Sequence, residues 1–182
     1  MKKNILAIIG SASSNSSNLR LVQQIALLSE NSLNIEIFEG LQSLPHFNAA
    51  LSVNRPPEAV QLIRQKIEQA DGILICTPEY IFSIPSGLKN LFEWCVATTI
   101  FAQKPTGLIT ASANGEKGHC ELMLIMQTIE AKFTEETSLL INGIKSKIDL
   151  EGNLQEALQN QLVQFINSLK KLVDETGQPP VI

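Results

Sequence analysis

The sequence has few cysteines and none of the cysteine patterns that build disulfide frameworks or zinc sites. Its 182 residues contain three, Cys76, Cys95 and Cys120, separated by long stretches of chain. No C-x-x-C pair occurs, so the usual spacing of zinc ligands and of redox dithiols is missing. An odd number of isolated thiols is typical of a reducing compartment, and we expect a cytoplasmic protein.

Runs of basic residues and long apolar segments are also missing. The net charge is −4, and only two short clusters bring lysines together, at 2–3 and 170–171. This pattern gives no support for nucleic-acid binding. The first apolar run is soon broken by a glycine and a serine tract, which indicates a strand rather than a signal peptide. No apolar run approaches the roughly 20 residues that span a bilayer.

Short apolar runs alternate with longer segments of helical periodicity. We expect strands at 5–9, 35–38, 73–76, 106–111 and 138–141. We expect a first helix that starts after Ser17 as its N-cap, and further helices at 60–70, 86–98, 119–133 and 153–176. This alternation is typical of repeated βαβ units in a doubly wound parallel sheet, here one domain over 1–182. The end at 177–182 is expected to be loose.

The loop after the first strand decides between two strand orders. A dinucleotide-binding fold requires G-x-G-x-x-G there, but the chain has Gly10 followed by Ser11-Ala12-Ser13-Ser14-Asn15. We therefore expect a flavodoxin-like order, 2-1-3-4-5. A phosphorelay receiver would need acidic residues at these strand ends, and a serine hydrolase would need G-x-S-x-G. Neither pattern is present.

The segment from Thr77 to Asn90 is the most informative part of the chain. It follows the buried strand at 73–76 and reads TPEYIFSIPSGLKN. Ligands of open α/β sheets bind at the carboxyl ends of strands, so a stiff loop with two prolines is suited to hold a flat molecule. A plain Pro-rich turn is the alternative.

This segment resembles the TPEYN-x-S-[IV]-P-G-x-L-K-N motif of the NADPH-dependent FMN reductase family. Two positions depart from the motif: Ile81 replaces an asparagine, and Ser86-Gly87 replaces glycine and a variable residue. The resemblance extends from the first strand to about Ile141. It implies an FMN site in which the ring is held, largely through backbone, by five residues of this loop: Pro78, Glu79, Tyr80, Ile81 and Ser83.

The first loop, 11–17, is rich in hydroxyls, contains no acidic or basic residue and leads into a helix. Free N–H groups at a helix N-terminus favour an anion, although a serine-rich capping turn would look the same. The family motif here, G-S-x-R-x-x-S-x-N, implies a phosphate site made by Ser11, Ser13, Ser16, Ser17 and Asn18. Ser13 replaces the motif arginine, which weakens the predicted site.

Two further segments complete the predicted site. The loop after the fourth strand contains Ser112, Asn114 and Gly115, which the resemblance places at the far edge of the flavin. A turn before a helix is the alternative. Tyr80 and His46, in the loop after the second strand, are candidate contacts for the substrate; for His46, a partly exposed loop residue without that role is the alternative. His119 is expected to be a surface or capping residue.

The resemblance implies an NAD(P)H-dependent oxidoreductase that passes hydride through FMN to a quinone, an azo compound, a metal oxyanion or free flavin. NADPH or NADH would be the co-substrate, and no catalytic side chain is required because the flavin carries the chemistry. A flavodoxin-like carrier with weakened FMN affinity is the alternative. We also expect a homodimer or homotetramer, with Trp94 partly buried at or near the subunit contact.

Replacing Ser13 with arginine should tighten FMN binding, because the phosphate loop would gain a positive charge. Charged hydrogen bonds contribute about 1.5–3 kcal/mol, and salt weakens them where they are exposed. FMN titration at low and high ionic strength measures the effect. An unchanged affinity would mean that the phosphate already has all its partners or binds elsewhere.

Overall fold

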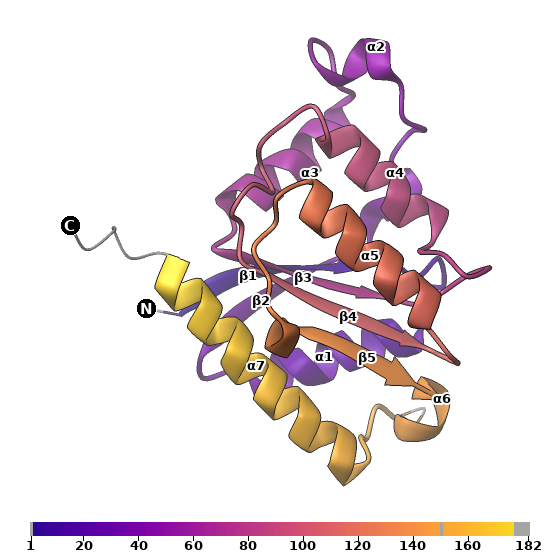
Figure 1. The fold of residues 1–182 in the computed structure, drawn as a ribbon, viewed down its shortest axis with the longest axis vertical. Coiled ribbons are helices and arrows are strands. Elements are labelled where there is room, and N and C mark those ends of the chain that lie inside the picture. The colour runs from indigo at the N-terminus through magenta and orange to yellow at the C-terminus, as the bar shows by residue number, and fades with distance from the viewer. Residues whose placement is uncertain (1, 150, 177–182) are drawn as a thin grey trace.

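Five parallel strands form one sheet in the order β2-β1-β3-β4-β5 (Figure 1). Their bounds are β1 Lys3–Ile9, β2 Leu33–Phe38, β3 Gly72–Thr77, β4 Thr106–Ser112 and β5 Ser138–Asn142. This computed structural model describes residues 2–149 and 151–176, so the predicted loose end at 177–182 lies outside the described residues. The predicted strand order and parallel pairing are confirmed.

The core has two halves because alternate residues of each strand point to opposite faces of the sheet. In β1, Ile5, Ala7 and Ile9 belong to one cluster, whereas Leu6 and Ile8 belong to the other. Strands buried on both faces read as continuous apolar runs, which is why β1 and β3 were recognisable in the sequence.

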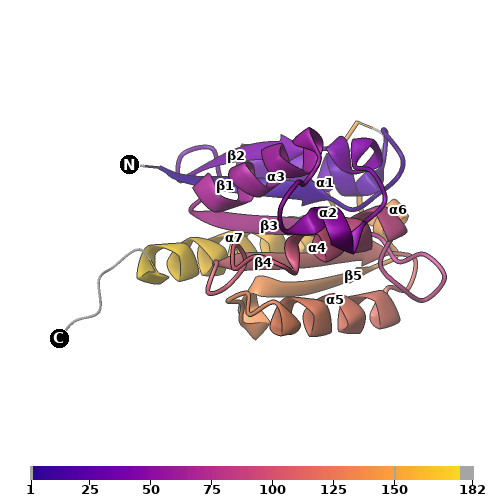
Figure 2. The same ribbon diagram turned by 90° about the horizontal axis from the view of Figure 1, so that it is seen from above.

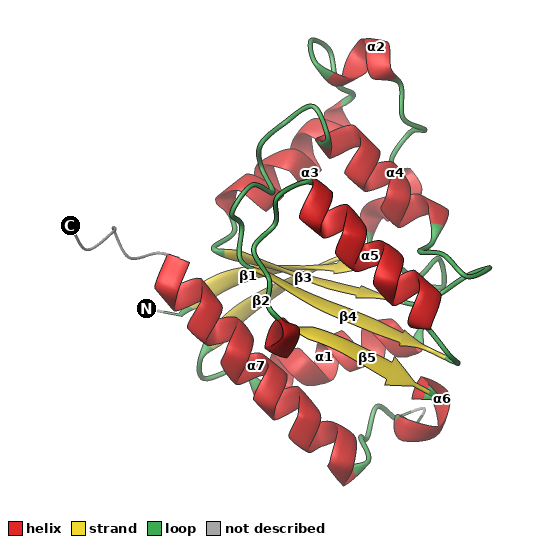
Figure 3. Ribbon diagram, viewed as in Figure 1, coloured by secondary structure: helices red, strands yellow, loops and turns green. Residues whose placement is uncertain are grey.

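Helices cover both faces of the sheet (Figures 1 and 3). Buried side chains of α1 (Ser17–Leu28) and α7 (Glu156–Thr176) pack into one cluster. The opposite face is covered by α3 (Glu58–Gln69), α4 (Ser86–Cys95) and α5 (Glu116–Thr128). Figure 2 shows the same layers from above. Each helix presents its apolar stripe to the sheet and its polar side to solvent.

Four short elements were not predicted. They are η1 (Gly40–Ser43), α2 (Ala49–Ser52), η2 (Glu135–Thr137) and α6 (Ile144–Lys147). One turn of helix is too short to show apolar periodicity. Several predicted bounds also shift: α5 starts and ends earlier than 119–133, α4 stops before residue 98, and α7 starts after residue 153. In residues 2–149 and 151–176, no helix is long and apolar enough to cross a membrane.

Trp94 lies inside the chain, which corrects the expectation that it is partly buried at a subunit contact. Its side chain has no exposed surface, and its Nε1 donates to the backbone oxygen of Pro45 at 2.7 Å. The Phe47 ring packs edge-on against it, with 5.3 Å between ring centroids. Trp94 therefore anchors the loop after β2 to α4.

His119 is buried, which corrects its assignment to the surface or to a helix cap. Its Nδ1 lies 2.9 Å from Thr110 Oγ1 in β4, and its Nε2 lies 3.1 Å from Ser138 Oγ in β5. Burial lowers the pKa of this imidazole from the ordinary value of 6.5, because removal from water disfavours the charged form. His119 thus connects α5 with two strands in its neutral form.

Replacing His119 with glutamine should make stability less sensitive to acid. Because the folded pKa lies below the unfolded value, the unfolded chain binds more protons in the window between them, and stability falls as the pH drops through it. We expect the wild type to lose stability between about pH 7 and pH 5 more steeply than the variant. Urea unfolding across this range measures it, with the exposed His46→Gln as control. Equal slopes for wild type and His119→Gln would contradict the prediction.

Candidate functional site

The candidate site lies at the carboxyl edge of the sheet, where β1 and β3 are neighbours. The chain leaves β1 toward α1 on one face and leaves β3 toward α4 on the other face. A crevice forms where the direction of winding changes in this way, and it is the usual ligand position in such folds. The loop between β3 and α4 projects beyond the strand ends on the right of Figure 1.

Gly10 brings the first loop into close contact with the second. Its N–H donates to the Cys76 oxygen at 2.8 Å, which extends the pairing of β1 with β3. A Cβ at this position would lie 2.3 Å from Thr77 Oγ1. Only glycine therefore permits this approach, which sets the first loop directly beside the start of the second.

The first loop is held by its own serines. Ser16, rather than the expected Ser17, caps α1 and accepts a hydrogen bond from the Leu19 N–H at 3.1 Å. Ser11 Oγ accepts from the Ser13 N–H at 3.2 Å. Among described residues, the N–H groups of Ser14, Asn15 and Ser17 have no hydrogen-bond partner. These donors and the α1 N-terminus suit an anion.

The Asn18 side chain points into the fold, which differs from the expectation that it contacts a phosphate. Its Nδ2 donates to the Ala111 oxygen at 3.1 Å, and its Oδ1 accepts from the Cys76 thiol at 3.3 Å. Burial raises the pKa of Cys76, so the thiol stays protonated and can donate. Asn18 thereby ties α1 to β3 and β4, and fixes the start of the helix beneath the first loop.

Arg20 contacts the first loop, although it is not part of the sequence motif. From α1 its Nη1 donates to Asn15 Oδ1 at 2.9 Å, and its Nη2 lies 3.4 Å from Ser17 Oγ. The three-residue spacing from Ser17 is the signal that could have found it, because residues at i and i+3 share a helix face.

The second loop contains a two-residue β-turn. The N–H groups of Tyr80 and Ser83 donate to each other's backbone oxygens at 2.9 and 3.1 Å. The residues between them, Ile81 and Phe82, have φ values of 51° and 59°. Positive φ at both central positions is the requirement of a type I′ turn, which favours asparagine and glycine. This explains why asparagine is common at position 81 of the family motif and why isoleucine there is strained.

Two carboxylates hold this turn in place. Glu121 of α5 accepts the Ser83 hydroxyl at 2.6 Å and the Ile84 N–H at 2.9 Å, both on Oε2. Glu79 accepts the Gly118 N–H at 2.8 Å, which connects the second loop with the first turn of α5. Hydrogen bonds to a charged acceptor are the strong ones. Glu121 was missed because nothing in its local sequence indicates a partner 38 residues away.

Tyr80 and Ser11 connect the first and second loops. The two hydroxyl oxygens lie 3.4 Å apart, and the Tyr80 side chain is 42% exposed. Pro78 is buried at the start of the second loop, and Pro85 directly precedes α4. Tyr80 therefore lies at the surface of the site between two stiff ends.

The third loop connects β4 with α5. Ser112 ends β4, Asn114 is exposed, and Gly115 precedes α5 with a φ of 93°. The loop is thus a turn before a helix, and its role at the flavin edge stays a prediction. By contrast, no described hydrogen bond joins His46 to any of the three loops; its neighbour Pro45 is bound to Asn90 and Trp94 of α4.

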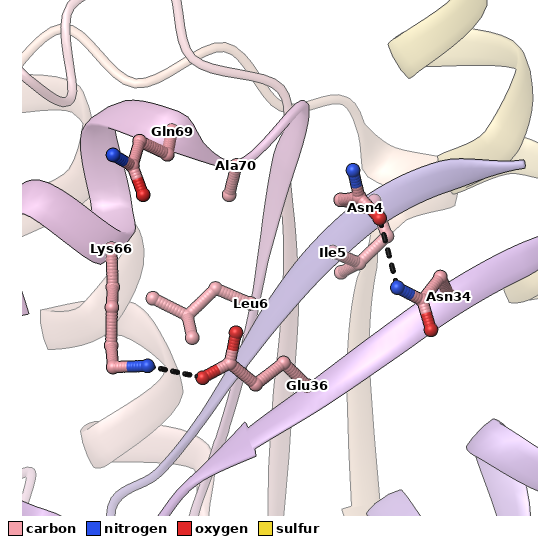
Figure 4. A pocket seen from close by; sticks show the side chains of 8 residues that line it. All are labelled: Asn4, Ile5, Leu6, Asn34, Glu36, Lys66, Gln69 and Ala70. Carbon is pink, nitrogen blue, oxygen red and sulfur yellow. Dashed lines mark hydrogen bonds and ion pairs between the residues drawn. The ribbon is translucent and has the colours of Figure 1, made fainter.

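A separate hollow lies toward the amino ends of β1 and β2 (Figure 4). Its charged groups are matched with each other, since Lys66 pairs with Glu36, and Asn34 Nδ2 donates to Asn4 Oδ1 at 2.8 Å. It is away from the strand ends where the three loops meet, and no unmatched charge in it points to a ligand.

The residues of the carboxyl edge fit FMN. The first loop has free backbone donors and no carboxylate for a phosphate, and the second loop, braced by α5, forms a partly apolar wall for a ring. The model of the family described as "NADPH-dependent FMN reductase" matches residues 3–144. The chain belongs to this family.

Relatives and solved structures agree with this assignment. The chain is 31% identical to an NADPH:quinone oxidoreductase of Arabidopsis thaliana, over 91% of this chain and 89% of that protein. It is 25% identical to a quinone reductase of Escherichia coli K12, over 90% and 94%. The fold of the flavoenzyme NAD(P)H:(acceptor) oxidoreductase FerB from Paracoccus denitrificans superposes with a TM-score of 0.83 at 21% identity, over 97% of this chain and all of FerB.

The protein is therefore an oxidoreductase that uses FMN as cofactor and NAD(P)H as hydride donor. The enzyme is favoured over the alternative of a non-enzymatic flavin carrier, because the matching family is defined by reductase activity.

Replacing Ile81 with asparagine should stabilise the protein. A β-branched residue at positive φ costs about 1–2 kcal/mol, which asparagine largely avoids, and the Ile81 side chain is 95% exposed and loses no packing. We expect the melting temperature to rise by about 2–4 °C per kcal/mol recovered. Calorimetry measures it. Val53→Asn is the control, because Val53 is exposed at an ordinary φ of −87°. A gain of the same size in both variants would rule out relief of turn strain.

Proposed function

We propose that the three loops bind FMN, and that the enzyme passes hydride from NADPH or NADH through the flavin to a small quinone. The observation that supports this most directly is the braced turn at Tyr80–Ser83, which is held between the first loop and helix α5. A preformed site loses little conformational entropy when a ligand binds.

The phosphate is assigned to the first loop. Hydroxyls of Ser11, Ser13 and Ser17 and the free N–H groups before α1 would donate to it. Ser16 and Asn18 contribute by fixing the helix start, since the Ser16 hydroxyl caps α1 and the Asn18 amide is bound in the core.

The ring is assigned to the second and third loops. Pro78, Glu79, Tyr80, Ile81 and Ser83 would hold it largely through backbone, because the Glu79 carboxylate and the Ser83 hydroxyl are already engaged. Ser112, Asn114 and Gly115 would close its far edge. When bound, FMN supplies the hydride chemistry, and the chain binds, orients and shields the ring.

A quinone is the proposed acceptor because two relatives are named for quinone reduction. Azo compounds, metal oxyanions and free flavin complete the panel of acceptors to be compared. Tyr80 is the proposed acceptor contact, since it is exposed beside the first loop, whereas His46 has no bond to the site.

Assembly and location are also part of the proposal. We expect a homodimer or homotetramer, as the resemblance implies, with a contact that does not involve the buried Trp94. We place the activity in the cytoplasm, because the three cysteines are free thiols and the hydride donor is a nicotinamide dinucleotide.

Two measurements test the proposed function. FMN titration of the apoprotein by flavin fluorescence should saturate at one FMN per chain. Oxidation of NADPH and of NADH should then be followed at 340 nm with each acceptor. FMN binding without nicotinamide oxidation by any acceptor would contradict the enzymatic proposal.

Replacing Tyr80 with alanine should raise the KM for the quinone and leave the fold intact. The side chain is 42% exposed, so its loss should cost far less than the roughly 3–5 kcal/mol of a buried aromatic. Steady-state kinetics and thermal melting measure both effects. Tyr80→Phe is the matched variant, because it keeps the ring and removes only the hydroxyl beside Ser11. A large fall in melting temperature with unchanged KM would instead make Tyr80 a structural residue.

A further inference from the structure

Arg20 is a cation held against the first loop. It lies one turn into α1, and a helical side chain of this length points back toward the helix N-terminus. Its two terminal nitrogens reach Asn15 Oδ1 and Ser17 Oγ, both neutral acceptors of the loop. The guanidinium is therefore fixed beside the free N–H groups that precede α1.

The charge of Arg20 has no negative partner within residues 2–149 and 151–176. Among the described residues, no carboxylate forms an ion pair with Arg20, and the first turn of α1 contains no acidic residue. A cation near a helix N-terminus also opposes the helix dipole. This arrangement is unfavourable in the protein alone and becomes favourable when an anion lies at the loop.

The guanidinium also has an unused donor. The Arg20 Nε is buried and has no hydrogen-bond partner, the only such side-chain atom in the part of the chain that the structure describes. Buried donors are nearly always paired. A role limited to bracing the loop would need only a neutral amide, without this cost.

We propose that Arg20 supplies the positive charge for the FMN phosphate, from the helix rather than from the loop itself. The inference rests on the proposed function, which puts the phosphate at this loop. The first loop itself has no positive charge because position 13 is serine. Arg20, seven residues later in the chain, provides that charge.

The test compares FMN with riboflavin, which has the same ring and ribityl chain but no phosphate. Arg20→Gln should weaken FMN binding by about tenfold to a hundredfold, as for the loss of one charged hydrogen bond, and leave riboflavin binding unchanged. The salt dependence of FMN affinity should also decrease in the variant. Lys2→Gln is the control, because it removes the same charge from an exposed position before β1 and should leave both affinities unchanged.

A second variant separates charge from loop bracing. Ser13→Arg in the Arg20→Gln background should restore FMN affinity, and it should gain more there than in the wild type, because the two cations serve the same phosphate. Equal losses for FMN and riboflavin in Arg20→Gln, or no rescue by Ser13→Arg, would overturn the proposal. If wild type binds no FMN, the proposed function itself fails; if wild type and Arg20→Gln bind FMN equally, only this inference fails.

Discussion

The reversal of winding direction between β1 and β3 is the constraint on which the site depends. A parallel sheet must be covered on both faces, and each right-handed crossover brings its helix to one of them. Because α1 follows β1 and α4 follows β3, the loops after β1 and β3 run to opposite faces of the sheet at its carboxyl edge. Gly10 keeps their first residues in contact, so the crevice opens only beyond the strand ends.

Two acidic residues of the candidate site hold the backbone of the second loop. Glu121 binds the second loop to α5, and Glu79 binds it to the N-terminal turn of α5 through Gly118. These bonds offset part of the strain of a turn with isoleucine at positive φ. Such bracing suits an enzyme whose cofactor carries out the reaction, because the protein then needs a fixed wall more than an acid or a base.

The first loop shows why a motif read position by position can mislead. Serine at position 13 predicts a first loop without a positive charge. In the structure, Arg20 returns from α1 to the same loop, because one helical turn brings it back over Ser17. The buried amide of Asn18 holds the helix start, which allows Arg20 to keep this position.

Local patterns were enough to predict the strand order, and the resemblance to the family motif added the three loops proposed as the site. A continuous apolar run such as 73–76 can be recognised from neighbouring residues alone. The same is true of the missing glycines after Gly10. Contacts between distant segments were not predictable in this way. Ser11 meets Tyr80 across 69 residues, and His119 is buried between Thr110 and Ser138, although its sequence neighbourhood looks like a helix start. Trp94 was assigned to a subunit contact for the same reason, since an apolar helix needs two partners and periodicity cannot say that one of them is the loop at Pro45. A side chain's periodicity shows which face it occupies, but its partner depends on how the whole chain closes around the sheet.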